Sequence, residues 1–349
     1  MPVQAAPERP LTTTPTGEPK PGGLEDQAAI EAAIALAIDP DAADALAKAD
    51  EDHHRNRRAP LLNRVLSMTA IIAPFLGLVA AMVMLWGVAF NWVYLAVLVV
   101  GYFATGFGIT IGYHRLFTHR SFQTSRFMTA VLGILGSMTV EGSILDWVAT
   151  HRRHHQHSDG EDDPHSPHGH EGGIRGFLKG FTHAHIGWFF TANHPDLRRY
   201  VKDLEGDALV RRVSNLFPLW AALGIILPGV VAGLVTMSWV GALLGVLWGG
   251  AVRIFLVHHV TWSINSACHI WGAQPFRSHD ESRNNPVFGL LAFGEGWHNN
   301  HHAFPTSAKH GLAWWQFDSS WLLIWAMAKI GLVWNVRVPS AERIESKRA

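Results

Sequence analysis

The chain has 349 residues, of which 48% are hydrophobic and only 16% are charged, and it contains 22 histidines and 15 tryptophans. Charged residues usually make up about a quarter of a soluble protein, so this composition favours a membrane protein with an unusual capacity for metal binding. A formal net charge of zero, with histidine neutral, gives no support to a nucleic-acid partner. The single cysteine, Cys268, excludes an intramolecular disulfide framework and any multi-cysteine zinc or iron–sulfur site.

Residues 1–58 are predicted to be an N-terminal extension of the folded part. Pro, Thr and Gly are frequent up to about Gly23, which is typical of disorder, and an Ala-rich acidic stretch follows that favours one or two short helices. No apolar core with a small-residue cleavage site precedes the first long apolar segment, so we expect no secretory signal. We predict a membrane domain over residues 59–340 and a C-terminal tail over residues 341–349.

Four apolar segments are long enough to cross a hydrocarbon layer of about 30 Å as helices. Only a few residues separate the first from the second and the third from the fourth, so each pair is predicted to form a transmembrane hairpin. Two further apolar stretches, 127–140 and 321–333, are shorter and fit interfacial or buried helices better. The predicted spans are about 66–88, 93–113, 217–237 and 239–258.

Basic residues flank the outer ends of both hairpins, whereas the short connections around Asn91 and Ser238 contain no Lys or Arg. The positive-inside rule therefore places both termini and the segment between the hairpins in the cytosol. This predicts a multi-pass protein of the inner (cytoplasmic) membrane. The flanking residues are Arg55, Arg57, Arg58 and Arg64; Arg115, Arg120 and Arg126; and Arg198, Arg199, Lys202, Arg211 and Arg212.

Eight histidines gather in three clusters on the predicted cytosolic side of the membrane. Residues three and four apart share a face of a helix, so each HxxHH triplet presents three imidazoles in one direction. Eight imidazoles exceed the four ligands of one zinc ion, which favours a two-metal centre, although imidazole suits iron, copper, nickel and zinc alike. The clusters are His114 and His119; His151, His154 and His155; and His298, His301 and His302.

Two of these histidines, His114 and His119, are five residues apart, so both reach one site only if their helix ends or bends between them. A fifth span over residues 127–140 would separate the first cluster from the second, so the metal site argues against one. The isolated histidines are interpreted as structural or surface residues: His157, His168, His170, His183, His194, His258, His259, His279 and His310.

The clusters lie within longer strings, Gly112-Tyr-His-Arg-Leu-Phe-Thr-His-Arg-Ser-Phe122 and Gly294-Glu-Gly-Trp-His-Asn-Asn-His-His-Ala-Phe-Pro305. Together with Asp163-Pro-His165, His185-Ile-Gly-Trp188 and Asn265-Ser-Ala-Cys-His269, they resemble the membrane fatty-acid desaturase family. The resemblance is greatest to the Δ9 acyl-CoA (stearoyl-CoA-type) desaturases and covers roughly residues 65–335. Membrane alkane hydroxylases have differently spaced histidine boxes and lack the WHNNHHxFP string.

The resemblance implies an all-α integral-membrane fold, with four transmembrane helices in two hairpins and a cytosolic helical cap that carries a histidine-ligated di-iron centre. It adds His269 to the eight clustered histidines as a ninth ligand, and it implies that Asn265 contacts one metal through water. Asp159, Asp163 and Glu295 are candidate acceptors for the second ring N–H of the ligands. The implied division is His114, His155, His269, His298 and His302 on one iron, and His119, His151, His154 and His301 on the other.

The resemblance also implies the reaction, in which two iron ions and O2 desaturate a long-chain fatty-acyl substrate at the cis-Δ9 position. An unactivated CH2 offers no acidic proton, so a cofactor must carry the difficult step. A bent apolar tunnel would position the acyl chain. Its kink corresponds to Trp147, Thr261 and Glu141, where the family has a glutamine, and its closed end to Tyr102 and Gly106. The intramembrane Arg253 is assigned a structural or head-group role.

The acyl carrier is left open, because the sequence departs from the animal enzymes where these bind the phosphates of CoA. Ala149, Ala192 and Asn193 occupy positions that are basic in those relatives. Arg175 and Lys179, in a loop that is about ten residues longer, and Arg198 and Arg199 are candidate substitutes for head-group binding. The carrier is therefore CoA, acyl carrier protein or a membrane lipid.

No fused electron donor is visible in the sequence. We expect a separate ferredoxin-like or cytochrome-like protein with an NAD(P)H reductase as the electron-donating partner. Two alternative functions remain: a membrane di-iron fatty-acyl or alkane hydroxylase, and a non-enzymatic membrane metal-binding protein.

Overall fold

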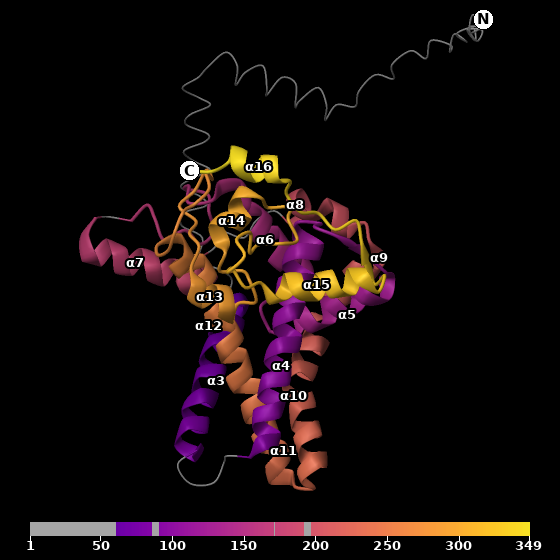
Figure 1. Cartoon of the computed structure of the whole chain (residues 1–349). Coiled ribbons are helices and arrows are strands. Elements are labelled where there is room, and N and C mark those ends of the chain that lie inside the picture. Colours follow the sequence, from indigo (N-terminus) through magenta and orange to yellow (C-terminus); the bar gives the residue numbers. More distant parts are fainter. Residues whose placement is uncertain (1–60, 86–90, 171, 192–196) are drawn as a thin grey trace, which may run out of the picture. The chain divides into compact units, whose positions relative to one another are not determined.

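The computed structural model describes residues 61–85, 91–170, 172–191 and 197–349, so the predicted extension 1–58 lies outside the described residues. The described part is mainly helical (Figure 1). Within these ranges the named strands are β1 (Gln123–Thr124) and β2 (Val333–Trp334), which pair antiparallel. The predicted all-α fold class is confirmed.

Four long helices stand side by side in Figure 1, and all four are long and apolar enough to cross a membrane. This confirms the predicted number of spans, but the second and fourth run further than expected, to Thr118 and His269. They are α3 (Leu61–Leu85); α4 (Trp92–Phe107), continued by a π-helix (Gly108–Thr118); α10 (Phe217–Thr236); and α11 (Trp239–Gly245), continued by a π-helix (Val246–Val252), α12 (Arg253–Ser266) and a 3-10 turn (Ala267–His269).

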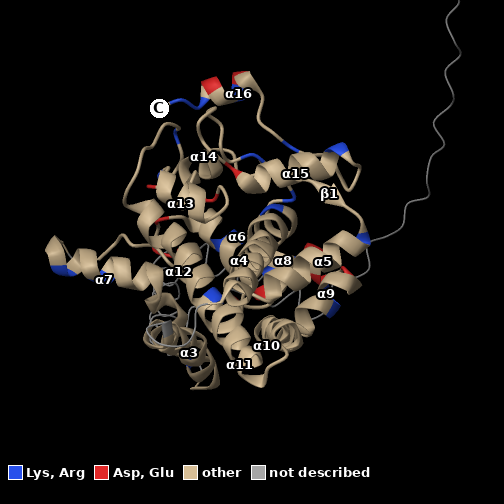
Figure 2. Cartoon of the chain, turned by 60° about the horizontal axis from the view of Figure 1, so that its bottom comes forward, with Lys and Arg blue, Asp and Glu red and all other residues tan. Residues whose placement is uncertain are grey.

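The second hairpin, α10 and α11, is closed by local capping and by small residues. Met237 adopts the left-handed conformation with φ of 50°, and the Ser238 side chain accepts a hydrogen bond from the Gly241 N–H at the start of α11. A Cβ atom added to Gly245 would lie 2.5 Å from Cβ of Ala232, so only glycine permits this close approach of the two helices. Neither helix carries a charged residue, as the uniformly tan ribbons in Figure 2 show.

Shorter helices gather at one end of the four long ones and form a cap (Figure 1). The two short apolar stretches predicted as interfacial or buried helices form α5 and α15. The cap elements are α5 (Arg126–Ser137), α6 (Ile144–His157), α7 (Gly173–His185), the 3-10 helix η2 (Gly187–Phe190), α8 (Leu197–Glu205), α9 (Ala208–Asn215), α13 (Pro286–Leu291), α14 (His298–Ala303), α15 (Ser319–Lys329) and α16 (Ala341–Ser346).

The residues expected as a C-terminal tail form α16 and are hydrogen-bonded to the cap. The Arg277 N–H donates to the Lys347 carbonyl at 2.8 Å, and the Lys347 ammonium donates to the Ala303 carbonyl at 2.7 Å. Since Ala303 follows the third histidine cluster directly, this segment lies against the helix that carries it.

Arg253 forms hydrogen bonds that connect several helices near the cap end of the bundle. Its guanidinium is buried and donates to the backbone carbonyls of Gly249, Gly224 and Met138 at 2.8–3.0 Å. A charge inside a membrane domain is expensive unless it is paired with polar groups, and backbone carbonyls provide them here. Of the two roles left open for Arg253, these bonds favour the structural one.

Candidate metal centre

A π-helical turn brings the first two histidines together. The backbone N–H of His119 donates to the carbonyl of His114 at 3.1 Å, and the ring centroids of the two residues lie 4.7 Å apart. A π-helix closes its turns with bonds between residues five apart, so such residues lie above one another. The sequence predicted that the helix ends or bends between His114 and His119. In the structure the helix widens to a π-helical turn and ends at Thr118, directly before His119.

The nine histidines expected as ligands lie in two groups, in each of which the potential ligand atoms are within 4.8 Å of one another. The implied division between two metals stays a prediction, and these proximity groups divide the nine histidines differently. His151 and His155, one turn apart on α6, face each other with Nε2 atoms 3.1 Å apart, whereas Asp163 holds His154 in the other group. The groups are His114, His119, His151, His155 and His301; and His154, His269, His298 and His302.

The ring nitrogens within each group have the arrangement of metal ligands. The Nε2 atoms of His155 and His301 lie 2.9 Å apart, and those of His269 and His298 lie 3.1 Å apart. Three further buried Nε2 atoms have no hydrogen-bonding partner among the described residues, namely those of His119, His154 and His302. A buried polar atom without a partner costs about 1–3 kcal/mol, so bound cations are the simplest way to satisfy these nitrogens. The donor set therefore fits two metal ions.

Carboxylates lie beside the other ring nitrogen, Nδ1, of four of these histidines, and three of them accept a hydrogen bond from it. Such a bond fixes the tautomer and leaves Nε2 with the free lone pair that a metal needs. Of the three acidic residues expected in this role, Asp159 and Asp163 accept such a bond, and Glu295 lies beside the His114 Nδ1. The pairs are Glu295 with His114 at 2.7 Å, Asp163 with His154 at 3.0 Å, Asp159 with His269 at 2.8 Å, and Asp280 with His302 at 2.5 Å.

Burial keeps most of the cap histidines neutral, which is the state that binds metals. Loss of hydration, reinforced by neighbouring imidazoles, holds the pKa of His151, His155 and His301 well below the usual histidine value. Burial also lowers the pKa of His154, but the carboxylates of Asp163 and its neighbours outweigh this effect and raise it above the usual value.

Sequence reasoning missed three residues of this site. Asp280 lies 22 residues before His302 in a loop, and no local pattern marks it. His310, interpreted as structural or surface, lies 3.1 Å from the Glu295 carboxylate and so helps to hold it. His165 was given no role, although the Asp163-Pro-His165 string marked it; its ring centroid lies 4.4 Å from that of His154.

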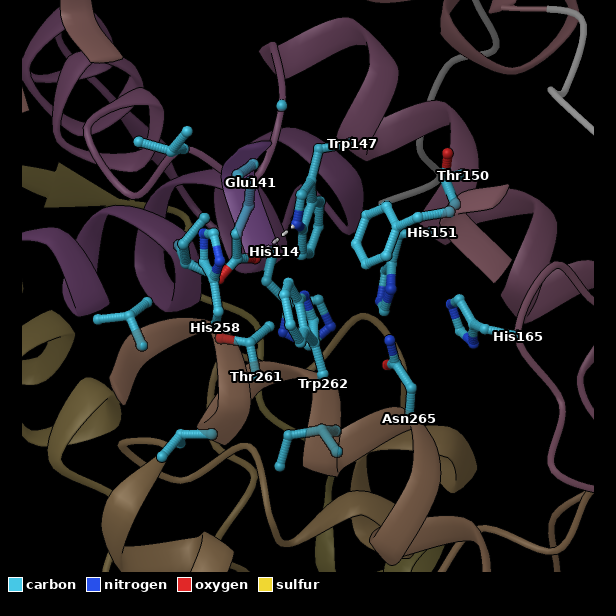
Figure 3. Close-up of a pocket in the computed structure, with 18 of the residues that line it drawn as sticks. His114, Glu141, Trp147, Thr150, His151, His165, His258, Thr261, Trp262 and Asn265 are labelled. Atoms are coloured by element: carbon cyan, nitrogen blue, oxygen red, sulfur yellow. Dashed lines mark hydrogen bonds between the residues drawn. The ribbon is translucent and has the colours of Figure 1, made fainter. Parts of the chain in front are cut away.

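An apolar cavity of about 680 Å³ adjoins the histidine groups, and its lining includes His114, His151 and His298. Figure 3 shows Asn265 pointing from α12 toward His151. A Cβ atom added to Gly106 would lie 2.2 Å from the Phe293 ring, so Phe293 packs directly against Gly106 in the cavity wall. All the residues predicted for the substrate tunnel line this cavity: Tyr102, Gly106, Glu141, Trp147 and Thr261.

A strained turn directs Glu141 into the cavity. Val140, a β-branched residue, adopts φ of +66°, which such residues rarely do, and Gly142 follows with φ of +117°. One carboxylate oxygen of Glu141 accepts from the Trp147 indole N–H at 3.2 Å (Figure 3). The Thr261 hydroxyl also interacts with the carboxylate. Burial raises the pKa of Glu141 to about 7, although these two bonds lower it.

The candidate head-group residues lie elsewhere. Arg175 and Lys179 are exposed on α7 and are absent from the cavity lining. Of the positions that are basic in animal relatives, Ala149 is fully buried, and Ala192 and Asn193 lie outside the described residues.

Comparisons with known proteins agree with this site. Residues 90–337 match the profile of the family described as "Fatty acid desaturase". The chain is 42% identical over 279 residues to a hex-5-enoyl-[acyl-carrier protein] acetylenase of Moorena producens, covering 79% of this chain and 87% of that protein. It is 38% identical over 253 residues to an sn-1 stearoyl-lipid 9-desaturase of Anabaena variabilis, covering 71% and 86%. It is 34% identical over 267 residues to an icosanoyl-CoA 5-desaturase of Limnanthes douglasii, covering 74% and 70%.

Proposed function

This chain belongs to the fatty acid desaturase family, and on that premise we propose that it inserts a cis double bond into a long-chain fatty-acyl substrate. In the balanced reaction a –CH2–CH2– unit, O2, two electrons and two protons give –CH=CH– and two waters. The proposal rests on one observation: histidines of both groups line the wall of an apolar cavity. The Δ9 position, expected from the motifs, is also the one in the name of the Anabaena relative.

We propose that the two histidine groups hold two iron ions. Bound iron would supply the oxidising power that C–H cleavage by O2 demands and that amino-acid side chains lack. The residues of the chain do the rest. Carboxylates orient the imidazoles, and the Trp147 ring stacks on His151 at 4.9 Å beside the cavity. The apolar cavity holds two adjacent methylenes near the histidines, a positioning task.

We further propose that the cap and its histidines lie on the cytosolic side of the inner membrane, which the distribution of basic residues supports. The single cysteine, Cys268, is buried and cannot hold an iron–sulfur cluster, so electrons must come from another protein. A ferredoxin-like or cytochrome-like donor with an NAD(P)H reductase fits this need. Steady turnover of the purified chain with NADPH alone would refute this part of the proposal.

The carrier of the acyl chain is a separate question. The motif resemblance favours CoA, whereas the relatives carry acyl carrier protein, lipid and CoA in their names. Loss of the basic residues that animal enzymes use at the matching positions weakens the case for CoA.

The test is the fatty-acid profile of a bacterial host that expresses the chain, measured by gas chromatography–mass spectrometry with double-bond derivatisation. A matched host expresses the His301→Ala, His302→Ala double variant. We expect a new cis-monoene only with the intact histidines, and derivatisation gives its position. A host that supplies donor and reductase but gains no new product, with folded protein present in the membrane, would contradict the proposal.

The main alternative keeps the same centre but makes a hydroxylated product, and a new hydroxy acid in the same experiment would identify it. A non-enzymatic metal carrier would need ligands along a path through the bilayer. The nine histidines instead gather at the cap end of the long helices, which disfavours that alternative.

A further inference from the structure

One wall of the acyl cavity is a membrane-spanning helix. Five residues of α3 line the cavity, from Asn63 to Ile71, which is about 12 Å of helix at a rise of 1.5 Å per residue. One of them, Leu66, is still 58% exposed. A residue that both lines the cavity and faces outward marks an opening, and this opening lies within the candidate span Leu61–Met84. The lining residues of α3 are Asn63, Leu66, Ser67, Ala70 and Ile71.

The far side of this opening is aromatic and is joined to a helix suited to a membrane surface. Trp188 and Phe189 of η2 line the cavity, and η2 packs against α3. The preceding α7 exposes Ile174 by 81% and Leu178 by 55%. Its cations stand on another face, so α7 is amphipathic and is expected to lie in the plane of the lipid headgroups. The opening between α3 and η2 would then be at the depth of the lipid ester groups.

The described lining of the cavity offers no cation to a carrier phosphate; the nearest cations on the two flanking helices are Arg64 on α3 and Arg175 and Lys179 on α7. Among the described residues that line it there is no Lys or Arg, whereas Glu141, Asp146 and Glu295 are acidic. CoA and the phosphopantetheine arm of acyl carrier protein both carry phosphates next to the thioester arm, and phosphate recognition relies on charge-assisted bonds to cations. The glycerol ester of a membrane lipid is neutral, and the phosphate of a phospholipid stays in the headgroup layer, where the bilayer rather than the protein solvates it.

We infer that the acyl chain enters sideways from the bilayer through the opening between α3 and η2, and that the substrate is the acyl group of an intact membrane glycerolipid. This inference rests on the proposed desaturase function and adds its substrate class. The ester and head group would stay at the membrane surface, while the acyl chain passes Ala70 and Ile71 toward Trp147 and His151.

The carrier is tested with the purified full-length chain, loaded with iron, in vesicles with a donor and reductase. The same labelled stearoyl chain is supplied as phosphatidylcholine, as stearoyl-CoA or on acyl carrier protein. Without acyltransferases, we expect the new double bond in the intact phosphatidylcholine. A double bond formed only on a thioester overturns the inference and leaves the desaturase function standing. No double bond on any carrier, with metal content and reduction verified, overturns the proposed function as well.

The opening is tested independently of turnover by photocrosslinking. A phosphatidylcholine with a diazirine in its stearoyl chain should label peptides of α3 and η2. Ala70→Trp, which fills the cavity side of α3, should abolish this labelling and lower turnover of the lipid by about a hundredfold through misplacement of the chain. Ala73→Trp is the matched control, because Ala73 lies on the same helix but does not line this cavity. Labelling that Ala70→Trp leaves unchanged, in protein with unaltered thermal stability, refutes lateral entry.

Discussion

Replacing Glu141 with glutamine should make the protein more stable, and increasingly so as the pH rises. The carboxyl is buried in an apolar cavity, and burial raises its pKa to about 7 from an ordinary value of 4.5. Because the folded-state pKa is the higher one, ionisation opposes folding. The penalty is absent below about pH 4.5, grows between pH 4.5 and 7, and is complete above pH 7. The difference between the two pKa values corresponds to about 3 kcal/mol.

Glutamine keeps the shape of the side chain and a carbonyl oxygen that can accept from the Trp147 indole and the Thr261 hydroxyl. We therefore expect the Glu141→Gln variant to exceed the wild type in unfolding free energy by about 3 kcal/mol at pH 8, and by little at pH 5. Thermal and denaturant unfolding in one detergent, from pH 5 to 8.5, measures this difference. The exposed substitution Glu345→Gln on α16 controls for the loss of a carboxylate in general.

The Glu141→Gln variant should also differ from the wild type in the pH dependence of its KM for the acyl substrate. An ionised carboxylate in the cavity holds water where methylenes must lie, so the KM of the wild type for the acyl substrate should rise above pH 7. In Glu141→Gln the KM should be nearly independent of pH. A stability difference between the two proteins that does not change with pH would show that Glu141 is not buried as described, and the reasoning would fail.

Three further predictions concern the supports of the metal centre and the bundle. Asp280→Asn should weaken iron binding by about 10–100-fold, measured by metal analysis after dialysis, because it loses the charged acceptor for His302; the exposed Glu281→Gln is the control. Gly294→Ala should destabilise the fold by more than about 1 kcal/mol in thermal unfolding, because φ is +109° and a Cβ atom would lie 2.3 Å from Asp318. Arg253→Met should lower the unfolding free energy by about 3 kcal/mol or more, since three buried carbonyls lose their donor.

The sequence predicts the parts of this fold whose signal is local. Apolar length gives the four spans, and HxxHH spacing places three imidazoles on one side of a helix turn. The division of the ligands between two groups has no such signal. It depends on a π-helical turn at His114 and on Asp163, which holds His154 away from its neighbours. Asp280 lies in a loop 22 residues before His302, and only the tertiary fold places its carboxylate beside that histidine.

Trp147 links the strained turn at Val140 to the histidine groups, which also line the cavity directly through His114, His151 and His298. Trp147 stacks on His151 and donates to Glu141, so any shift of the turn that carries Glu141 would also disturb an imidazole of the larger histidine group. A strained backbone persists when the surrounding packing determines it, and here the indole, Thr261 and the cavity wall do so. We therefore expect the same contacts to set the position of a bound acyl chain along the cavity and the orientation of the His151 imidazole. The double bond should accordingly form at one fixed distance from the point where the chain passes Trp147.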